Sequence, residues 1–390
     1  MDRQASQRKP TRPGIRIFYG FILIFVSINV AIWITGYTYI YKTLFYTYPD
    51  IDDLGIFDAR IVKSEQPAEW PSGADYNKKS LSAATRSELE RTESVSFLII
   101  RNDSVRYEEY WDNYQPNSLS NSFSVAKSII GILIGIAAEE GKLNINDPAG
   151  KYLPEFSAGE NAKLSIRHLL MMSSGLNWDE SYSSLFSQTT EAYYGSGLKK
   201  QMQSLKVVTE PGKTFNYMSC NTEILGLILE KATGMKLSEY ASRKLWSPVE
   251  AMHAGYWSLD QSDGMEKAYC CFYADARDFA RIGQLMLDSG KWKGKTILSP
   301  GFVREMTTPK NLVDDQGMAA NYYGYHWWLT EFKGHPIFYA RGILGQYIVV
   351  IPDQRMVIVR LGKKRGEKIP PNQYSDMIAY VNGALEAYGN

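Results

Sequence analysis

Residues 124–140 read SVAKSIIGILIGIAAEE, an apolar run that begins with a serine and is followed by Gly141. Apolar residues occupy nearly every face of a helix drawn through this run, which is typical of a helix buried in a protein core. The run is too short to cross a bilayer, and glycine is a typical residue just after a helix end. We therefore predict a buried helix that begins at Ser124.

Ser124 and Lys127 stand one turn apart at the start of this predicted helix. Side chains at positions i and i+3 face the same way, and the free amides of a helix N-terminus favour developing negative charge. Burial lowers the pKa of a lysine because desolvation disfavours the ammonium form, so a neutral Lys127 can accept the proton of the Ser124 hydroxyl. The alternative is an N-cap serine beside a lysine whose stem packs on apolar surface. The Ser-x-x-Lys spacing occurs twice more, neither time at the start of a strong helix.

A second candidate element, residues 211–221, reads PGKTFNYMSCN and leads into another predicted helix. Tyr217 is a candidate proton carrier, because a tyrosinate stabilised by a neighbouring lysine can relay the serine proton to a leaving group. Ser219 or Asn221 can hold Lys127 by hydrogen bonds, or can serve only as the helix N-cap. The chain has 27 tyrosines, so simple packing is the competing interpretation of Tyr217.

A third candidate element, residues 340–346, reads ARGILGQ and precedes an alternating, strand-like stretch. Gly342 and Gly345 allow the backbone to approach a ligand closely. An edge strand here can offer a backbone N–H that forms an oxyanion hole together with the N–H of Ser124. The structural alternative is that the two glycines mark a bulge.

The first 41 residues divide into a basic tail and an apolar segment. Residues 17–41 contain no charged side chain, and a helix of this length exceeds the roughly 20 residues needed to cross a bilayer core. Residues 1–16 hold five basic side chains and one acidic one, so the positive-inside rule predicts a cytoplasmic tail and an exported remainder. A cleaved signal peptide is the alternative, but no small-x-small site follows the apolar core. We expect a single-pass anchor in the cell (inner) membrane, contacting lipid through residues 17–41.

The composition excludes several classes of protein. The chain is 44% hydrophobic and 22% charged, which is typical of a folded protein and not of a disordered one. The basic tail carries the excess of positive charge, so the remainder is slightly acidic and is not a nucleic-acid-binding domain. Three cysteines, two of them adjacent, are too few and too badly spaced for a disulfide framework or a cysteine zinc site. Four scattered histidines indicate no metal site, and we expect no cofactor.

The exported part is predicted to hold one large domain behind a linker. Residues 42–90 are rich in Asp, Pro, Ser and Lys with little periodicity, which predicts a linker wrapping onto a domain over 91–390. Alternating patterns predict β-hairpins over 94–110 and 346–361, and an amphipathic helix closes the chain over 373–388. Because the stretch between the hairpins is mostly helical, we predict an α/β (α+β) fold: an antiparallel sheet built from both chain ends, with an inserted helical subdomain.

Taken together, these stretches resemble the serine hydrolases of the β-lactamase and penicillin-binding-protein superfamily, in the branch of class C β-lactamases, esterases and 6-aminohexanoate-dimer hydrolases. The resemblance runs from about Ser94 to Leu361 and implies a β-lactamase/transpeptidase-like fold. Its motifs agree in order: SVAK at 124–127, GKL at 141–143, DP at 147–148, YLP at 152–154, HLLMMSSG at 168–175, PG at 211–212, F-x-Y-x-S at 215–219, DARD at 275–278, WW at 327–328 and G-x-x-GQ at 342–346.

The resemblance also implies roles for individual residues. Ser124 is expected to be the acylated nucleophile, Lys127 its base partner and Tyr217 the proton relay. Ser219 fills the last place of the family's Tyr-x-Asn or Tyr-x-Ser element. The oxyanion hole is expected to use the backbone N–H groups of Ser124 and Ile343, and water then deacylates the enzyme. The expected substrate-contacting residues are Tyr182, Trp328, Gly342 and Gly345.

The third motif departs from the pattern of β-lactamases and DD-peptidases. Those enzymes carry Lys-Thr-Gly or His-Ser/Thr-Gly where this chain has Ala340-Arg341-Gly342. The cation at the first place is missing, and regular pleating is expected to turn Arg341 to the other face of the strand. The motif form is more similar to that of 6-aminohexanoate-dimer hydrolases and related esterases.

We therefore expect a membrane-anchored serine hydrolase, periplasmic or otherwise extracytoplasmic, that cleaves a small-molecule or peptide amide or ester. The alternatives are a DD-peptidase or D-amino-acid-specific peptidase acting on cell-wall peptides, and a non-catalytic wall-binding homologue. The sequence predicts no oligomeric state.

Overall fold

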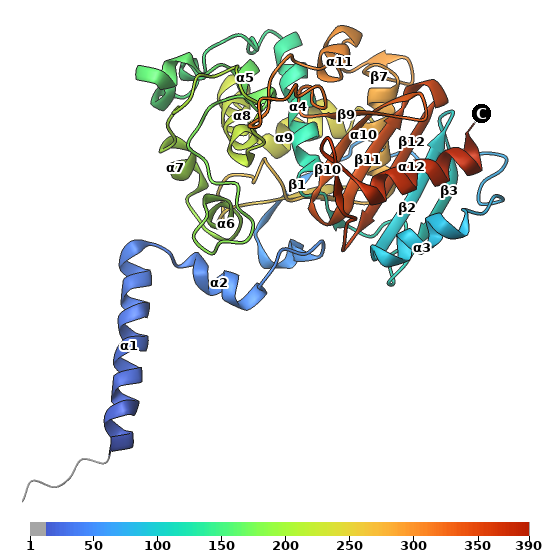
Figure 1. Ribbon diagram of the computed structural model, residues 1–390. Coiled ribbons are helices and arrows are strands. Elements are labelled where there is room, and N and C mark those ends of the chain that lie inside the picture. Colours follow the sequence, from blue (N-terminus) through green and yellow to red (C-terminus); the bar gives the residue numbers. More distant parts are fainter. Residues whose placement is uncertain (1–12, 390) are drawn as a thin grey trace, which may run out of the picture.

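The computed structural model describes residues 13–389, so residues 1–12 of the predicted basic tail lie outside the described residues. Its centre is a six-stranded antiparallel sheet in the order β3-β2-β12-β11-β10-β9 (Figure 1). Two strands come from the N-terminal half of the chain and four from its C-terminal part: β2 (Ser94–Arg101), β3 (Ser104–Tyr110), β9 (Trp328–Phe332), β10 (His335–Gly342), β11 (Gln346–Ile351) and β12 (Met356–Gly362). The prediction of an antiparallel sheet assembled from the two chain ends is confirmed.

The two predicted hairpins form and join each other in the middle of the sheet. Asn102 and Asp103 turn the first hairpin with φ values of +48° and +60°, the left-handed pair that tight hairpin turns require. Strand β12 pairs antiparallel with β2, Val359 lying opposite Leu98. Because both strands are buried on both faces, helices must cover the sheet on each side.

Helices supply that cover. Helix α10 (Ala276–Leu287) packs on one face so closely that a Cβ at Gly283 would lie 2.4 Å from Val357 Cγ1. On the other face lie α12 (Ser375–Tyr388) and α3 (Ala83–Arg91), side by side in Figure 1. The sheet and its two covers form the first lobe of the molecule.

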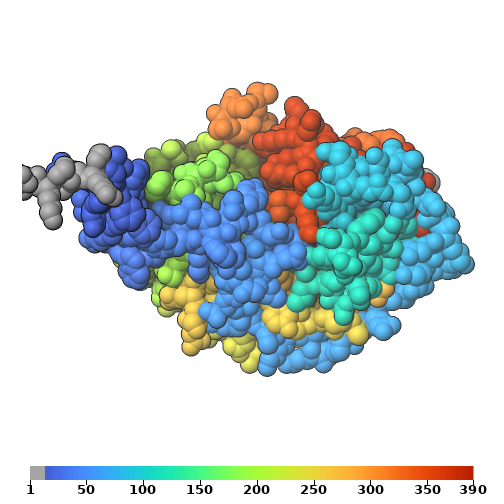
Figure 2. All heavy atoms as spheres, turned by 90° about the horizontal axis from the view of Figure 1, so that it is seen from below, coloured from blue at the N-terminus to red at the C-terminus, as the bar shows by residue number. Residues whose placement is uncertain are grey.

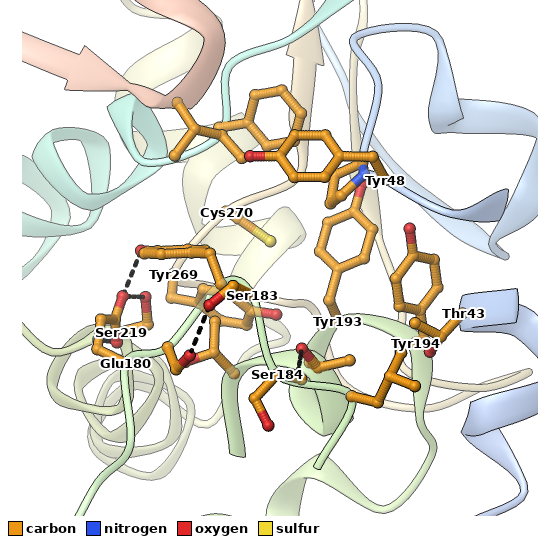
Figure 3. Close-up of a pocket in the computed structure, with 18 of the residues that line it drawn as sticks. Thr43, Tyr48, Glu180, Ser183, Ser184, Tyr193, Tyr194, Ser219, Tyr269 and Cys270 are labelled. Atoms are coloured by element: carbon orange, nitrogen blue, oxygen red, sulfur yellow. Dashed lines mark hydrogen bonds between the residues drawn. The ribbon is translucent and has the colours of Figure 1, made fainter. Parts of the chain in front are cut away.

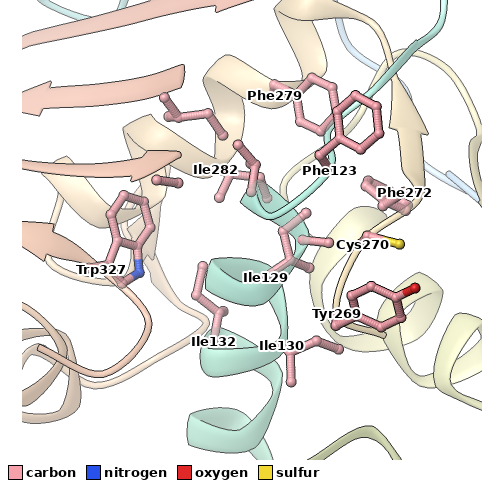
Figure 4. Close-up of a cluster of buried hydrophobic side chains, with 14 of the residues drawn as sticks. Phe123, Ile129, Ile130, Ile132, Tyr269, Cys270, Phe272, Phe279, Ile282 and Trp327 are labelled. Atoms are coloured by element: carbon pink, nitrogen blue, oxygen red, sulfur yellow. The ribbon is translucent and has the colours of Figure 1, made fainter. Parts of the chain in front are cut away.

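The second lobe is the inserted helical subdomain. Its longest helices are α4 (Val125–Glu139) and α8 (Ser219–Thr233), which pack on each other. The shorter ones are α5 (Ile166–Leu170), α6 (Gln188–Tyr194), α7 (Leu198–Gln203) and α9 (Leu237–Ala241). Figure 4 shows α4 at the centre of the core, its isoleucines facing α10 and Trp327 on one side and the segment around Tyr269 on the other. The predicted buried helix is therefore present and joins the two lobes.

Residues 42–90 contain more regular structure than the sequence predicts. Strand β1 (Ala59–Val62) joins a second antiparallel sheet with β5 (Gly255–Ser258), β6 (Phe272–Ala274) and β4 (Ser120–Asn121). Helix α3 begins at an N-cap, Ser82, which accepts a hydrogen bond from the Thr85 N–H. Only two residues of α3 are buried, so its sequence lacks the apolar period by which a helix is recognised.

The N-terminal apolar segment forms helix α1 (Pro13–Thr35), which projects from the body of the molecule (Figure 1). By length and composition α1 is the one described helix that can cross a membrane, a test that a signal sequence also passes. Helix α1 ends before the uncharged stretch does. Gly36 adopts a φ of +80°, and a second helix, α2 (Tyr39–Tyr46), begins after it. Tyr39 and Ile40, which were predicted to belong to the membrane span, are instead buried against the body.

Candidate active site

Ser124 lies where strand β4 turns into helix α4. Strand β4 is held by pairing with β6, in which Asn121 lies opposite Tyr273. Phe123 then adopts a φ of +45°, a left-handed conformation that bulky residues seldom adopt, while its N–H donates to Asn121 Oδ1 at 3.0 Å. Backbone strain of this kind persists where the surroundings hold it and is concentrated at functional sites. The turn presents Ser124, half-buried, at the helix N-terminus.

The ammonium group of Lys127 is buried directly behind Ser124. Lys127 is 1% exposed, and its Nζ lies 3.0 Å from Ser124 Oγ, 3.2 Å from Ser219 Oγ and 2.8 Å from the Tyr269 carbonyl oxygen. Burial lowers the pKa of Lys127 to about 8, because desolvation outweighs the raising effect of nearby Glu180 and Glu223. A substantial fraction of this lysine is therefore a neutral amine near pH 8, within reach of the serine hydroxyl.

Glu180 accepts hydrogen bonds from Ser219, the residue whose hydroxyl contacts Lys127. Its carboxylate accepts hydrogen bonds from Ser219 Oγ at 2.7 Å and from the Ser219 N–H at 2.6 Å. Trp178 Nε1 donates to it at 2.6 Å, and the Tyr182 hydroxyl also donates to it. The predicted contact between Ser219 and Lys127 is thus present and is oriented by a carboxylate that the sequence analysis missed. Asn221, the alternative partner, donates to Met172 Sδ instead.

Replacing Glu180 with glutamine is expected to shift the pH dependence of acylation. The rate should rise with pH through a midpoint near 8 in the wild type, because the neutral form of Lys127 is the expected base. Removing the negative charge of Glu180 removes an interaction that raises the pKa of Lys127, so the midpoint should move to lower pH. Stopped-flow acylation across pH 6–10 measures it. The control is Glu160→Gln, which removes a carboxylate from an exposed pair with Lys163 and should leave the midpoint unchanged. An unchanged midpoint in Glu180→Gln would show that Glu180 does not raise the pKa of Lys127.

Tyr217 flanks the same pair of residues. Lys127 Nζ lies 5.2 Å from the centre of the Tyr217 ring, which packs 5.3 Å from the Trp328 ring. Burial raises the pKa of Tyr217 above its usual range, although a hydrogen-bonding interaction with Ser124 and the charge of Arg341 oppose the shift. Burial therefore favours the phenol form of the resting side chain, because a buried phenolate lacks sufficient compensation for its lost hydration.

The end of strand β10 passes beside Ser124. A Cβ at Gly342 would lie 2.4 Å from the Ser122 carbonyl oxygen and 3.2 Å from Phe123 Cβ. Gly342 thus allows strand β10 to approach the backbone just before Ser124. The sequence analysis expected it to allow a close approach to a ligand. Within residues 13–389, neither the Ser124 N–H nor the Ile343 N–H donates to a protein acceptor. Both amides are therefore available to a developing oxyanion.

Gly342→Ala is expected to destabilise the fold and to slow acylation. The φ of Gly342 is −117°, so the cost is steric: the new methyl group collides with the Ser122 carbonyl, and overpacking of this kind costs about 1–3 kcal/mol. Urea denaturation measures the free energy of unfolding, and burst kinetics measure acylation. Gly301→Ala, which meets only Ser299 Oγ at 3.7 Å, is the matched control. Equal stability of the two variants would show that the strand end has room to move.

Two cavities meet at Ser124. The first, which we call the aromatic pocket, has a volume of about 720 Å³ and is shown in Figure 3. Its larger side chains are those of Tyr48, Phe123, Glu180, Tyr182, Leu185, Tyr193, Tyr194, Tyr269 and Ile343. The second, which we call the charged pocket, has a volume of about 320 Å³. Its charged side chains are those of Asp314, Asp315, Arg341, Arg365 and Lys368, beside Tyr217 and Trp328. Ser124, Tyr182 and Ile343 line both.

Comparison with known proteins identifies the family. Residues 81–374, well over half of the chain, match the model of the beta-lactamase family. The chain belongs to the beta-lactamase family. In sequence it is 28% identical over 289 residues to the 6-aminohexanoate-dimer hydrolase of Paenarthrobacter ureafaciens, a match that covers 70% of this chain and 73% of that one. It is 26% identical over 304 residues to Protein flp of Staphylococcus aureus (strain COL), covering 71% of this chain and 60% of that one.

Solved structures agree with this assignment. A candidate 6-aminohexanoate-dimer hydrolase from Bacillus anthracis superposes with a TM-score of 0.74 at 23% identity, covering 85% of this chain and 90% of that one. A family VIII carboxylesterase superposes with a TM-score of 0.63 at 15% identity, covering 82% of this chain and 99% of that one. These two likenesses concern the fold, and they confirm the predicted β-lactamase/penicillin-binding-protein architecture.

In this beta-lactamase-family protein, Arg341 lines the charged pocket. This corrects the prediction that its side chain lies on the other face of the strand. Arg341 and Trp328 lie on one face of the sheet, because Trp328 pairs with Tyr339, two residues before Arg341. The guanidinium carbon is 3.6 Å from the centre of the Trp328 ring, and the group donates to the Asn372 carbonyl at 2.6 Å. A cation is therefore present in the charged pocket, one place later than in Lys-Thr-Gly enzymes.

The other predicted substrate-contacting residues divide into two groups. Tyr182, Trp328 and Gly342 line the cavities beside Ser124. Gly345 lines neither, and its φ of +83° belongs to a turn around the buried Arg360, whose guanidinium donates to the Gly345 carbonyl. The structure thus supports the alternative interpretation of Gly345 as part of an irregular strand connection.

Two cysteines and one histidine of this family member take part in local structural contacts. Cys270 and Cys271 form one disulfide between neighbouring residues, which is a single local bond and not a disulfide framework. Among residues 13–389, one group of potential metal ligands gathers within 4.8 Å: His253, Asp275 and Asp278. Their carboxylates already accept hydrogen bonds, Asp275 from the N–H of Asp278 and Asp278 from the N–H groups of Met252 and His253. The cluster caps α10 and needs no ion for this.

Proposed function

We propose that this protein is a membrane-anchored serine hydrolase that cleaves an amide or ester bond through an acyl-Ser124 intermediate. The observation that carries the proposal is the position of Lys127 Nζ, 3.0 Å from Ser124 Oγ, on a lysine whose pKa burial lowers to about 8. An N-cap serine with a surface lysine would leave the lysine exposed and its stem on apolar surface. Here the ammonium group itself is buried and points at the hydroxyl.

The proposed acylation step uses these groups in turn. Neutral Lys127 takes the proton of Ser124 Oγ as the oxygen attacks the carbonyl carbon. The oxyanion that forms is stabilised by the N–H group of Ser124, at the N-terminus of α4, and by that of Ile343, just after β10. The phenol of Tyr217 donates a proton to the leaving amine or alcohol and recovers one from Lys127, so no net charge is left. Water, activated by the same pair, then hydrolyses the acyl-serine.

The amide or ester specificity is supported by the relatives and by the charged pocket. Two of the proteins that this chain resembles carry the names of a 6-aminohexanoate-dimer hydrolase and a carboxylesterase. The cations and carboxylates of the charged pocket can bind a polar portion of the substrate. Release of D-alanine from a muropeptide, with no turnover of linear amides or esters, would instead favour the DD-peptidase.

Labelling with a fluorophosphonate tests the nucleophile directly. The full-length protein, held in detergent micelles, should gain one adduct by intact mass, and peptide mapping should place the adduct on Ser124. Hydrolysis of p-nitrophenyl acetate should fall as the adduct forms. A folded protein with neither an adduct nor ester turnover would contradict the proposal and favour a non-catalytic wall-binding protein.

We also propose that α1 anchors the chain with its hydrolase domain, residues 91–390, outside the cytoplasm. The exposed apolar surface of α1 supports its role as an anchor, and the basic residues of the N-terminal tail support the orientation. In sealed right-side-out membrane vesicles, added protease should degrade the hydrolase domain. Protection of the domain until detergent is added would contradict this orientation.

A further inference from the structure

The aromatic pocket is walled on one side by the segment that follows the apolar helix. Thr43, Thr47 and Tyr48 line it, and the first of these lies only eight residues after the end of α1 at Thr35. Helix α2 packs on α6, and Figure 1 shows both on the side of the body from which α1 projects. The cavity that contains the Ser124 hydroxyl therefore reaches the part of the protein nearest to any bilayer that α1 crosses.

Exposed apolar side chains surround this side of the pocket. Leu44, Phe45 and Phe186 are 65%, 79% and 67% exposed, and Leu185 is also exposed while it lines the pocket. The ring of Tyr37 lies 6.0 Å from that of Phe186, which joins the two segments. Figure 2 views this face from below and shows the blue N-terminal segment lying against green residues of the helical subdomain. A contiguous apolar surface beside a membrane helix is typical of an interfacial contact with lipid.

The lining of the aromatic pocket suits a hydrocarbon chain. Glu180 is the one charged side chain of its lining, which lies wholly within the described residues, and its carboxylate already accepts hydrogen bonds from Ser219, Trp178 and Tyr182. Three of its four threonine hydroxyls donate within the protein: Thr43 to the Tyr39 carbonyl, Thr189 to that of Asp179 and Thr190 to that of Ser184. Polar groups that are already paired do not need a polar ligand. The charged pocket, which meets it at Ser124, has the contrary character, because arginine, lysine and aspartate side chains line it.

We propose that the substrate is an amphiphile, an ester or amide of a medium- or long-chain acid that enters from the bilayer, with its acyl chain in the aromatic pocket. This inference rests on the proposed function, because Ser124 must attack the carbonyl between the two pockets. The Ser124 Oγ–carbon bond forms as the bond to the alcohol or amine breaks, and the leaving group departs through the charged pocket with the proton from Tyr217. Water then releases the carboxylic acid, whose chain returns to the lipid.

The first test measures chain-length selectivity of the full-length protein in nanodiscs, with p-nitrophenyl esters from acetate to octanoate. Full burial of a methylene gives about a fourfold gain per carbon, so kcat/KM should rise at least a hundredfold across the series. Ser183→Trp places an indole in the pocket, and the octanoate-to-acetate ratio should fall at least tenfold. Ser204→Trp, at an exposed serine outside both pockets, is the control and should leave the ratio unchanged.

The outcomes separate this inference from the proposed function. Acyl-Ser124 formed from acetate with a flat chain-length series, or with a ratio unchanged by Ser183→Trp, would overturn the inference and leave the proposed function standing. No acyl-enzyme from any ester would overturn the proposed function first.

A second measurement does not depend on turnover or on the folding of Ser183→Trp. A lauroyl ester with a terminal diazirine is incorporated in nanodiscs with the Ser124→Ala protein and photolysed. Crosslinks should map to residues 43–49 and 181–194, which line the pocket. Crosslinks confined to α1 would show that the chain stays in the lipid and would overturn the inference.

Discussion

Ser124→Ala is expected to lower kcat for ester hydrolysis by about a millionfold, the loss measured when a serine nucleophile is removed from a catalytic group that acts as a unit. The reason lies in the geometry: Ser124 Oγ is the acceptor of the buried Lys127 amine at 3.0 Å and stands beside the Ser124 and Ile343 amides, which donate to no acceptor in the part of the chain that the structure describes. Without the oxygen these groups still polarise a carbonyl, but no acyl-enzyme forms. Burst kinetics with p-nitrophenyl acetate and intact mass measure both effects.

A matched control for this variant exists within the chain. Ser196 also precedes a lysine by three residues but is exposed and lines neither pocket. Ser196→Ala should keep full activity and still form the adduct. If Ser124→Ala kept its turnover, or if its acyl adduct moved to another residue without loss of rate, Ser124 would not be the nucleophile.

Lys127→Ala is expected to slow acylation by about 10²–10⁴-fold, as does the loss of a positioned general base. In addition, the increase of rate with a midpoint near pH 8 should disappear, because the group that loses its proton there is gone. Tyr217 cannot take over at neutral pH, since burial raises its pKa and keeps it protonated. Stopped-flow acylation across pH 6–10 gives the rate and the midpoint together.

Lys199→Ala provides the control for the second large effect. Lys199 belongs to the exposed Ser-x-x-Lys repeat and should be replaceable without consequence for the pH profile. Wild-type acylation in Lys127→Ala, or an unchanged midpoint, would show that another group acts as the base. Because Lys127 is buried, circular dichroism and urea denaturation must first show that the variant is folded.

Features that depend on local pattern were predictable from the sequence. The buried helix over 125–139 is visible in its composition, and its start at Ser124 follows from where the apolar run begins. The two hairpins are visible in their alternation and turns. The order of the motifs was sufficient to place Tyr217 and Ile343 beside Ser124, because agreement of several short motifs in order is far more specific than each one alone.

Features that depend on long-range contact were not predictable. The carboxylate of Glu180 and the carbonyl of Tyr269 hold Ser219 and Lys127 from segments far along the chain. A glutamate in a polar loop has no periodicity to mark it, and a backbone carbonyl has no side-chain identity at all. Arg341 was placed on the wrong side of the cleft because strand alternation tells which residues share a face but not which face borders the cavity.

The sequence by itself determined the family, the sheet built from two chain ends, the buried helix and the pairing of Ser124 with Lys127. The family rests on the resemblance of several short motifs, in order, to those of known serine hydrolases, and the other three rest on composition, period and spacing, which are properties of neighbouring residues. Only the tertiary structure decided the depth at which Lys127 is buried and the packing of α2 beside the pocket. Both depend on surfaces that meet after folding, because the burial that lowers the pKa of Lys127 is produced by residues from several distant parts of the chain.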